Sequence, residues 1–451
     1  MEHLALGPLD GRYSEIKDKL SPYFSEYALT KNRVWVEINW LLFLIDTLEE
    51  LKNTDKEKIE SIYNGFSEED YFKVKEIEDI TKHDVKAVEL FVGEKLKQNN
   101  LSDLISFVHI GCTSEDINNT AYANMIKSAI REVWKPIADK LIEKISVIAE
   151  EYKSVPMLAH THGQPATPTT VGKEFAVFIH RFKRVLNQID NIKICSKFNG
   201  ATGNYSAISI AYPKYDWQKL SQEFVEKYLK LEFSPVTTQI ESHDYIVEVC
   251  DSIRHFNNIL LDLDVDMWLY ISKEYFKQVA VKGEVGSSTM PHKVNPIKFE
   301  NSEANVDMSN TIFMALSNKL PRSRMQRDLS DSSSQRNIGL GFGYSIQAII
   351  QTTEALNRVS VNEEKLKEEL NNKWELLAEP IQTILRKYKI PDAYNTLKEL
   401  TRGKNISKEA IQEFISTLNI LSEQDKNMLL NLTPEKYIGK AKEIVEKELK
   451  D

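Results

Sequence analysis

Polar segments that contain glycine, histidine, arginine, lysine and serine interrupt the sequence at widely separated places. They read DGRY at 10–13, TKHDV at 81–85, HIGCTSEDINN at 109–119, AHTHGQPATP at 159–168, TTQIESHDY at 237–245, GEVGSSTMPHKVNP at 283–296 and RMQRDLSDSSSQRN at 324–337. Any one of them alone could be a capped turn, because Thr, Ser, Asp and Gly are favoured at helix ends for structural reasons. The residue types that remain after capping are those that catalysis uses.

These remaining side chains could bind an anion and move protons. His83, His109 and His162 can transfer protons near neutral pH. Ser287 and Ser288 lie among glycines, which permit unusual backbone angles and close approach of the chain. Arginine and lysine bind carboxylates or phosphate, and the candidates are Arg12, Lys293, Arg327 and Arg336. The pattern indicates an anion site with acid and base groups, and it gives no sign of a metal or another cofactor.

Other motif interpretations fit less well. His160 and His162 could be a metal pair, but no cysteine or carboxylate follows at ligand spacing. GLGFGY at 339–344 lacks a preceding strand and the complete dinucleotide motif, so close packing of helices explains it better. GEVGSS is not the nucleophile elbow of a serine hydrolase. His180, His243 and His255 are predicted to be surface or packing residues, and His292 is ambiguous.

Long helices are expected to separate and position these segments. Over 244–271 apolar residues recur at alternating spacings of three and four, which is the heptad pattern of a long bundle helix. Similar patterns cover 130–152 and 175–192, and weaker ones cover 298–319 and 338–361. Few segments alternate with the period of a strand. The sequence therefore predicts an all-α protein with a central bundle of about five long helices.

Changes of pattern divide the chain into three expected domains. They are an N-terminal helical domain at 1–103, a central long-helix bundle at 104–356 and a C-terminal helical domain at 357–451. Apolar stripes this long favour packing against other subunits, so we expect an oligomer. The alternative is a monomeric bundle whose stripes are all covered internally.

Composition limits the class of protein. The chain has 451 residues, 41% of them hydrophobic, and a net charge of −9 with both signs interspersed. This charge argues against a nucleic-acid or membrane-surface role. Three distant cysteines fit a reducing compartment. The start resembles no signal peptide, and no stretch approaches about 18 uninterrupted apolar residues. We therefore expect a cytoplasmic protein without a membrane or nucleic-acid partner.

The combination of motifs resembles a known enzyme superfamily. GSSTMPHKVNP at 286–296 resembles the signature loop of the fumarase/aspartase superfamily, whose members eliminate fumarate from substituted succinates. DGRY, KHDVKAVE, HIGCTSEDINN, THGQPATP and MPHKVNP together resemble its adenylosuccinate lyase branch of bacterial type, along essentially the whole chain. The resemblance implies an all-α, three-domain protomer whose five-helix bundle joins three others in a homotetramer with a twenty-helix core. It further implies active sites built from three subunits, with no cofactor.

The resemblance also assigns roles to individual residues. Ser287 would be the base that removes the succinyl Cβ proton, and His162 the acid that protonates the departing purine nitrogen. A neutral serine is too weak a base, so backbone N–H groups, a helix N-terminus or Lys293 must lower its pKa. Positions for the succinyl carboxylates are matched by Lys293, Asn295, Thr113, Ser114 and Gln239, and positions for the nucleotide by Arg12, Tyr13, His83, Asp84, Arg327, Ser332 and Arg336.

His160 stands where relatives of this branch often carry arginine before THGQ. A histidine here either alters substrate contacts or only solvates the turn, and the second interpretation is favoured.

The implied reaction releases fumarate from two purine intermediates. Adenylosuccinate would give AMP, and succinylaminoimidazole carboxamide ribotide would give aminoimidazole carboxamide ribotide. Another lyase of the superfamily, such as argininosuccinate lyase, needs no phosphate clamp, and the arginines at 12 and 324–336 speak against it. A non-catalytic structural protein on the same scaffold, or a helical binding module, gives no reason to retain Ser287, His162 and Lys293.

Overall fold

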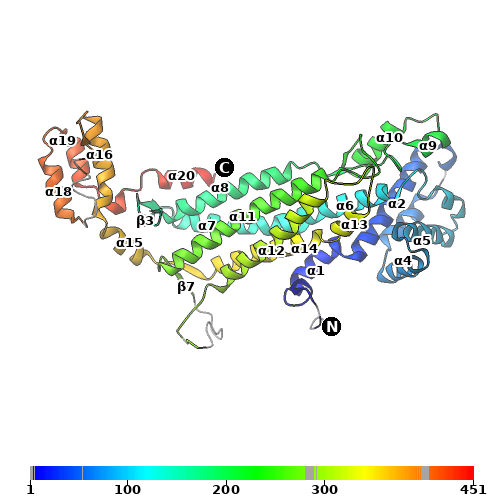
Figure 1. Ribbon diagram of the computed structural model, residues 1–451, viewed down its shortest axis with the longest axis horizontal. Coiled ribbons are helices and arrows are strands. Elements are labelled where there is room, and N and C mark those ends of the chain that lie inside the picture. The colour runs from blue at the N-terminus through cyan, green and yellow to red at the C-terminus, as the bar shows by residue number, and fades with distance from the viewer. Residues whose placement is uncertain are drawn as a thin grey trace. The chain divides into compact units, whose positions relative to one another are not determined.

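The computed structural model describes residues 4, 6–52, 54–279, 289–290, 292–393, 395, 397 and 406–450 (Figure 1). Its regular structure is almost entirely helical, so the all-α prediction is confirmed. The α-helices are α1 (Ser14–Phe24), α2 (Glu26–Thr47), α3 (Lys56–Asn64), α4 (Glu68–Thr81), α5 (Asp84–Gln98), α6 (Ser114–Ala129), α7 (Lys135–Glu151), α8 (Val171–Asp190), α9 (Ser206–Ala211), α10 (Trp217–Glu223), α11 (Asp244–Ser272), α12 (Ile297–Lys319), α13 (Ser330–Gln335), α14 (Ile338–Leu356), α15 (Glu363–Asn371), α16 (Ala378–Lys387), α18 (Lys408–Thr417), α19 (Glu423–Leu430) and α20 (Ala441–Glu448).

The strands of the described residues are two or three residues long and pair two by two. The pairs are β1 (Pro156–Met157) with β4 (Thr169–Thr170), β2 (His160–Thr161) with β3 (Gln164–Pro165), β5 (Cys195–Ser196) with β6 (Glu232–Phe233), and β7 (Phe276–Gln278) with β8 (Val359–Val361). The pair of β5 and β6 is parallel and the others are antiparallel. No larger sheet forms within the described part of the chain.

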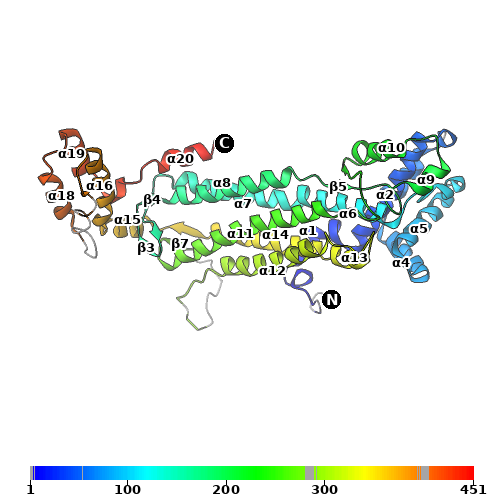
Figure 2. The same cartoon turned by 45° about the horizontal axis from the view of Figure 1, so that its top comes forward.

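All five predicted long helices are present, as α7, α8, α11, α12 and α14 (Figure 2). A π-helical turn at Ile130–Trp134 joins α6 to α7, so that helix is continuous from Ser114 to Glu151. The prediction for 338–361 is wrong at its end. The helix stops at Leu356, and residues 359–361 form β8, where two valines favour the extended backbone.

The described residues form two compact units. The first contains those of 1–138, 185–258 and 304–349, and the second those of 139–184, 259–303 and 350–451. The boundary between the units falls within each of the five long helices. The three-domain division at 103 and 356 therefore stays a prediction.

In the first unit a polar line runs through the apolar core between helices. The buried Trp134 indole donates to Ser345 Oγ at 2.9 Å, and its ring meets Phe256 edge-on at 5.0 Å. The Ser345 hydroxyl donates to Asn257 Oδ1 at 2.8 Å, and the Asn257 amide donates to Ser309 at 3.0 Å. Each polar group is satisfied, so the line fixes the register of α11, α12 and α14 without an unpaired buried dipole.

The glycines of α14 allow its close packing in the first unit. A Cβ added at Gly339 would lie 2.5 Å from Phe24 Cβ, and one at Gly341 would lie 2.7 Å from the Phe313 ring. No real Cβ tolerates these distances. The interpretation of GLGFGY as a helix-packing motif is thus confirmed.

Helix α2 carries the polar residues that later shape the site. Its sequence is apolar on nearly every face, and it packs against α1, α3, α5 and α6. A helix that is apolar all round is expected to be buried on all sides. Arg33 and Glu37 are nevertheless buried within it, one helical turn apart. Such buried charges need partners.

In the second unit the C-terminal helices α16, α18 and α19 pack around a hydrophobic core of their own (Figure 2). Ile381, Leu385, Ile411, Ile415 and Leu429 are almost completely buried in it. Within the described residues, every helix is too short or too polar to cross a bilayer.

A buried carboxyl group lies among α11, α12 and α14 in the second unit. The Thr352 hydroxyl lies 2.6 Å from Asp264 Oδ1 and 2.8 Å from Ser302 Oγ. Asp264 Oδ2 has no hydrogen-bond partner in the described part of the chain. Burial raises the pKa of Asp264 well above its ordinary value, and the two hydroxyls only partly offset this effect. A proton on Oδ2 is therefore the form that the fold favours.

We predict that Asp264→Asn makes the thermal stability less dependent on pH. The folded protein retains a proton that the unfolded chain releases above about pH 4, so the parent loses stability as pH rises towards the raised pKa, by up to about 1.4 kcal/mol per pH unit. Asparagine has no proton to release. Unfolding midpoints between pH 5 and 8 should fall by several degrees more in the parent than in Asp264→Asn.

Asp262→Asn is the matched control, because Asp262 lies on the same helix with a side chain that is 53% exposed and paired with Arg181. An Asp264→Asn protein whose pH profile equals that of Asp262→Asn would contradict the prediction.

Candidate active site

Most of the predicted site residues belong to the first unit, and the second contains His162, Lys293 and Asn295. The predicted base Ser287 and its neighbour Ser288 lie outside the described residues. In the first unit the polar segments are those at 10–13, 83–84, 109–119, 197–205, 237–243 and 327–336. Hydrogen bonds and ion pairs join several of these segments to one another.

The 109–119 segment is anchored by the start of α6. Thr113 is the N-cap residue, and its backbone N–H donates to Asp116 Oδ2 at 2.8 Å. Ser114 is the first helical residue, so the unpaired N–H groups and the positive end of the helix dipole lie beside these two hydroxyls. An amino end of this kind favours an anion.

Asp116 also holds the 197–200 segment. Its Oδ1 accepts from the backbone N–H of Asn199 at 3.0 Å and lies 3.0 Å from Lys197 Nζ. Lys197 Nζ also donates to the Gly200 carbonyl at 2.8 Å, and neither charged side chain is exposed. A buried ion pair of this geometry is costly to break, because either partner alone is an uncompensated charge.

A chain of buried polar contacts leads from Arg327 to Asp84. Arg327 Nη2 lies 3.0 Å from Glu115 Oε1, which also accepts from Asn118 Nδ2 at 2.9 Å. Arg33 Nε donates to Asn118 Oδ1 at 2.8 Å, and Arg33 Nη2 donates to Asp84 Oδ2 at 2.7 Å. The predicted residues Asp84 and Arg327 are thus connected through side chains from α2 and α6.

The chain continues to Arg336. Its Nη2 donates to Asp84 Oδ2 at 3.3 Å, and its Nη1 donates to the Glu26 carboxylate. Burial raises the pKa of Asp84, but the charges of Arg33 and Arg336 and a backbone hydrogen bond outweigh it, so the net pKa is lowered. Asp84 is therefore ionised at neutral pH.

Gln239 lies beside Arg327, whose Nη1 donates to Gln239 Oε1 at 3.3 Å. The two predicted residues are therefore in direct contact.

A buried histidine, His243, fixes the loop that carries Gln239. Gln335 Nε2 lies 3.1 Å from His243 Nε2, and Asp331 Oδ2 lies 3.5 Å from the same nitrogen. His243 is 1% exposed, so its prediction as a packing residue is confirmed. This contact joins the 237–243 loop to α13.

His109 is held by a carboxylate on α2. Its Nδ1 lies 2.6 Å from Glu37 Oε1, and its backbone N–H donates to Glu37 Oε2 at 3.2 Å. Burial lowers the pKa of His109, but the hydrogen bond and charge of Glu37 outweigh it, so the net pKa is raised. The Glu37 carboxylate thus fixes the position of the His109 ring and favours its protonated form.

The remaining predicted residues of the first unit are exposed or partly buried. His83 is the N-cap of α5, and its Nδ1 accepts from the Lys86 backbone N–H at 3.2 Å. Arg12 is exposed, and Tyr13 precedes α1. Ser332 lies in α13, where its N–H donates to Asp331 Oδ1 at 2.6 Å.

In the second unit His162 lies at the tip of a β-hairpin. Thr161 pairs with Gln164, so His162 and Gly163 are the two turn residues, with φ of 52° and 70°. Two positive φ angles are typical of a type I′ turn, which suits the strand twist. The turn exposes the imidazole. This hairpin was not predicted from the sequence.

His160 lies in β2, before the turn, and its side chain contacts residues of the segment that follows α11. Lys273 Nζ lies 3.3 Å from His160 Nε2, and the Tyr275 ring centroid lies 6.3 Å away. Burial and the Lys273 charge lower the pKa of His160, so it is neutral at pH 7. These contacts join the hairpin to the segment that follows α11.

The end of the 283–296 segment leads into α12. Lys293 is exposed, and its backbone N–H donates to the Met290 carbonyl at 3.1 Å. Gln278 Nε2 donates to the Val294 carbonyl at 2.7 Å, which ties this segment to β7. Asn295 is half-buried, two residues before the helix begins.

Several residues that sequence analysis did not include in the site support it. They are Glu26, Arg33, Glu37, Glu115, Asp116, Asn118, Lys197 and His243. Arg33 and Glu37 could have been found, since they are charged residues one turn apart in the largely apolar run at 33–45 of α2. Glu115 and Asp116 had no such signal, because acidic residues in a first helical turn are common for structural reasons.

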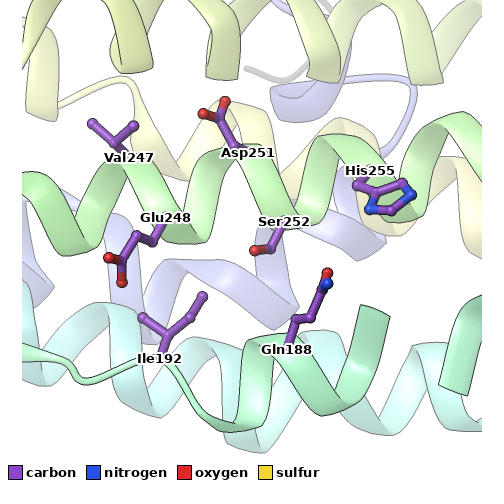
Figure 3. A pocket seen from close by; sticks show the side chains of 7 residues that line it. All are labelled: Gln188, Ile192, Val247, Glu248, Asp251, Ser252 and His255. Carbon is purple, nitrogen blue, oxygen red and sulfur yellow. The ribbon is translucent and has the colours of Figure 1, made fainter. Parts of the chain in front are cut away.

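An open surface pocket of about 420 Å³ lies elsewhere in the first unit, between the end of α8 and α11 (Figure 3). None of the predicted site residues lines it. Its polar residues are Gln188, Glu248, Asp251, Ser252 and His255. Among the described residues no cluster of three His, Cys, Asp or Glu side chains could hold a metal ion.

Solved structures share the fold. A fumarate lyase from Mesorhizobium sp. BNC1 superposes with a TM-score of 0.75 over 96% of this chain and 97% of its own, at 17% identity. The 3-carboxy-cis,cis-muconate lactonizing enzyme from Pseudomonas putida gives 0.74 over 97% of this chain and 96% of its own, also at 17% identity. At such identities the likeness concerns the architecture alone.

Sequence comparison is more specific. The Lyase family model matches residues 11–308, and the model for the adenylosuccinate lyase C-terminal region matches residues 323–438. The adenylosuccinate lyase of Haemophilus influenzae is 49% identical over 449 residues, 98% of each protein. That of Escherichia coli K12 is 47% identical over 443 residues, 97% of each. Over nearly its whole length, therefore, the chain belongs to the adenylosuccinate lyase family.

Proposed function

We propose that this protein eliminates fumarate from adenylosuccinate to give AMP, and from succinylaminoimidazole carboxamide ribotide to give aminoimidazole carboxamide ribotide. The observation that carries the proposal is the pair Arg327 and Arg336. A continuous network of charged and amide side chains joins them, and it includes Glu115 at the amino end of α6. In a chain of this family, such an arrangement suits a substrate with both carboxylates and a phosphate.

The reaction needs a base, an acid and a site for negative charge. The Ser287 oxygen would take the proton from the succinyl Cβ. The electron pair then forms the Cα=Cβ double bond of fumarate as the bond from Cα to the purine nitrogen breaks. His162 would donate the proton that this nitrogen receives. Charge developing on the adjacent carboxylate requires donors in fixed positions.

The donors proposed for the succinyl carboxylates come from three segments. Thr113 and Ser114 lie at the amino end of α6, and Gln239 contacts Arg327. Lys293 and Asn295 precede α12. Lys293, backbone N–H groups or a helix terminus would also have to lower the pKa of Ser287 for it to act as a base.

The nucleotide would bind to the other predicted residues. The candidates for its phosphate are the arginines Arg12, Arg327 and Arg336, together with Ser332. Tyr13, His83 and Asp84 would hold the remainder of the nucleotide.

Assembly as a homotetramer with sites shared by three subunits is part of the proposal. Large apolar side chains stay exposed on the long helices of one protomer, among them Val265, Trp268, Leu269, Met308 and Met314. Other subunits would cover these side chains. We expect a cytoplasmic enzyme that needs no cofactor and has no nucleic-acid or membrane partner. A monomer with a complete site is the alternative.

The first prediction for this function concerns the products. Purified protein incubated with adenylosuccinate should release AMP and fumarate in equal amounts, measured by chromatography. Ser287→Ala and His162→Ala should each lower kcat by about 10²–10⁴-fold, because each removes one proton-transfer group.

Turnover of argininosuccinate in place of adenylosuccinate would instead favour another lyase of the superfamily. A well-folded protein that turns over neither substrate would favour a non-catalytic role.

A second prediction concerns the shared site. Mixed protomers of Ser287→Ala and His162→Ala should regain part of the activity after subunit exchange, because a hybrid contains some sites with both residues intact. Exchange is checked by mass spectrometry of labelled subunits. Confirmed exchange without any regained activity would contradict a site composed of several subunits.

A further inference from the structure

We propose that Glu26 is an internal counter-ion for Arg336, which competes with the anionic group that Arg336 binds. The inference rests on the proposed function, in which Arg336 contacts the substrate's phosphate. Arg336 directly follows α13, and it donates from Nη1 to Glu26 and from Nη2 to Asp84. In the free protein, carboxylates thus occupy the guanidinium edges that a phosphate would need.

The charges around Asp84 show which carboxylate balances Arg336. Asp84 Oδ2 lies 2.7 Å from Arg33 Nη2 and 3.3 Å from Arg336 Nη2. The Arg33 side chain is 4% exposed, so its charge depends on Asp84 for compensation. The negative charge of Asp84 therefore compensates chiefly the positive charge of Arg33. The negative charge available to Arg336 is that of Glu26.

The ion pair of Glu26 and Arg336 can be replaced by a contact between Arg336 and a ligand at little cost in stability. Their side chains are 51% and 34% exposed, and ion pairs this accessible contribute little to stability. Glu26 is the first residue of α2, where the helix dipole favours a carboxylate without any cation. The Ser25 side chain accepts from the Ala28 N–H, so the helix end stays capped when Glu26 moves.

The second arginine provides the contrast. Arg327 pairs with Glu115, whose side chain is 4% exposed and also bound by Asn118. Breaking that pair would leave a buried charge without a partner. Arg327 is thus held in place, whereas Arg336 can exchange one carboxylate for a phosphate, which offers several oxygens in the bidentate geometry that arginine prefers.

The test is a calorimetric titration of AMP into the full-length protein and its variants. Glu26→Gln should bind AMP about threefold to tenfold more tightly at low ionic strength, because a competing charge near the phosphate is lost. The gain should shrink as salt is added. Glu26→Ala should give the same result. In the Arg336→Gln background, Glu26→Gln should have no effect on the AMP affinity.

Glu15→Gln is the matched control, since it removes one negative charge from an exposed position of α1 in the same unit. Its AMP affinity should equal that of the parent. Equal tightening in Glu15→Gln would overturn the proposal, because the effect would then reflect net charge alone.

Two failures are distinguishable. If the parent binds no AMP, or if Arg336→Gln binds AMP as tightly as the parent, then the assignment of Arg336 to the nucleotide is wrong. If AMP binding depends on Arg336 but Glu26→Gln leaves it unchanged, the competition by Glu26 is refuted and the proposed function stands.

Discussion

Buried charges that need partners are the constraint on which the candidate site depends. Arg33, Glu115, Asp116 and Lys197 are all nearly inaccessible to water, and an unpaired charge there would cost several kcal/mol. Each finds its partner on a segment distant in sequence. Arg33 binds Asp84, Glu115 binds Arg327, and Lys197 binds Asp116. Segments that the long helices separate in sequence are thereby fixed against one another.

This constraint explains how rigid helices can support a site that lies on loops. The polar line through Trp134 and Ser345 fixes the helix register, and the paired charges near the amino end of α6 fix the loops. Catalysis by preorganised charge requires donors whose positions do not change when the reaction begins. Exposed pairs such as Glu26 with Arg336 lie at the edge of the network, where exchange with a ligand is possible.

The sequence predicted local structure better than long-range pairing. The heptads of 244–271 and the other long segments predicted five helices that the structure contains, because helical periodicity is a local property. The end of α14 at Leu356 and the hairpin turn at His162 were missed, since short strands carry almost no periodic signal. The pair of Glu115 and Arg327 could not be predicted, because nothing near Glu115 in sequence indicates a partner 212 residues away.

A double-mutant cycle on Glu115 and Arg327 tests most directly whether paired buried charges hold the site together. Unfolding free energies would be measured at one protein concentration for Glu115→Gln, Arg327→Met and the double variant. Each single variant should lose about 3–5 kcal/mol, and the double variant should lose clearly less than their sum, because neither charge is then left unpaired. Strictly additive losses would show that the two side chains act independently and would contradict the account.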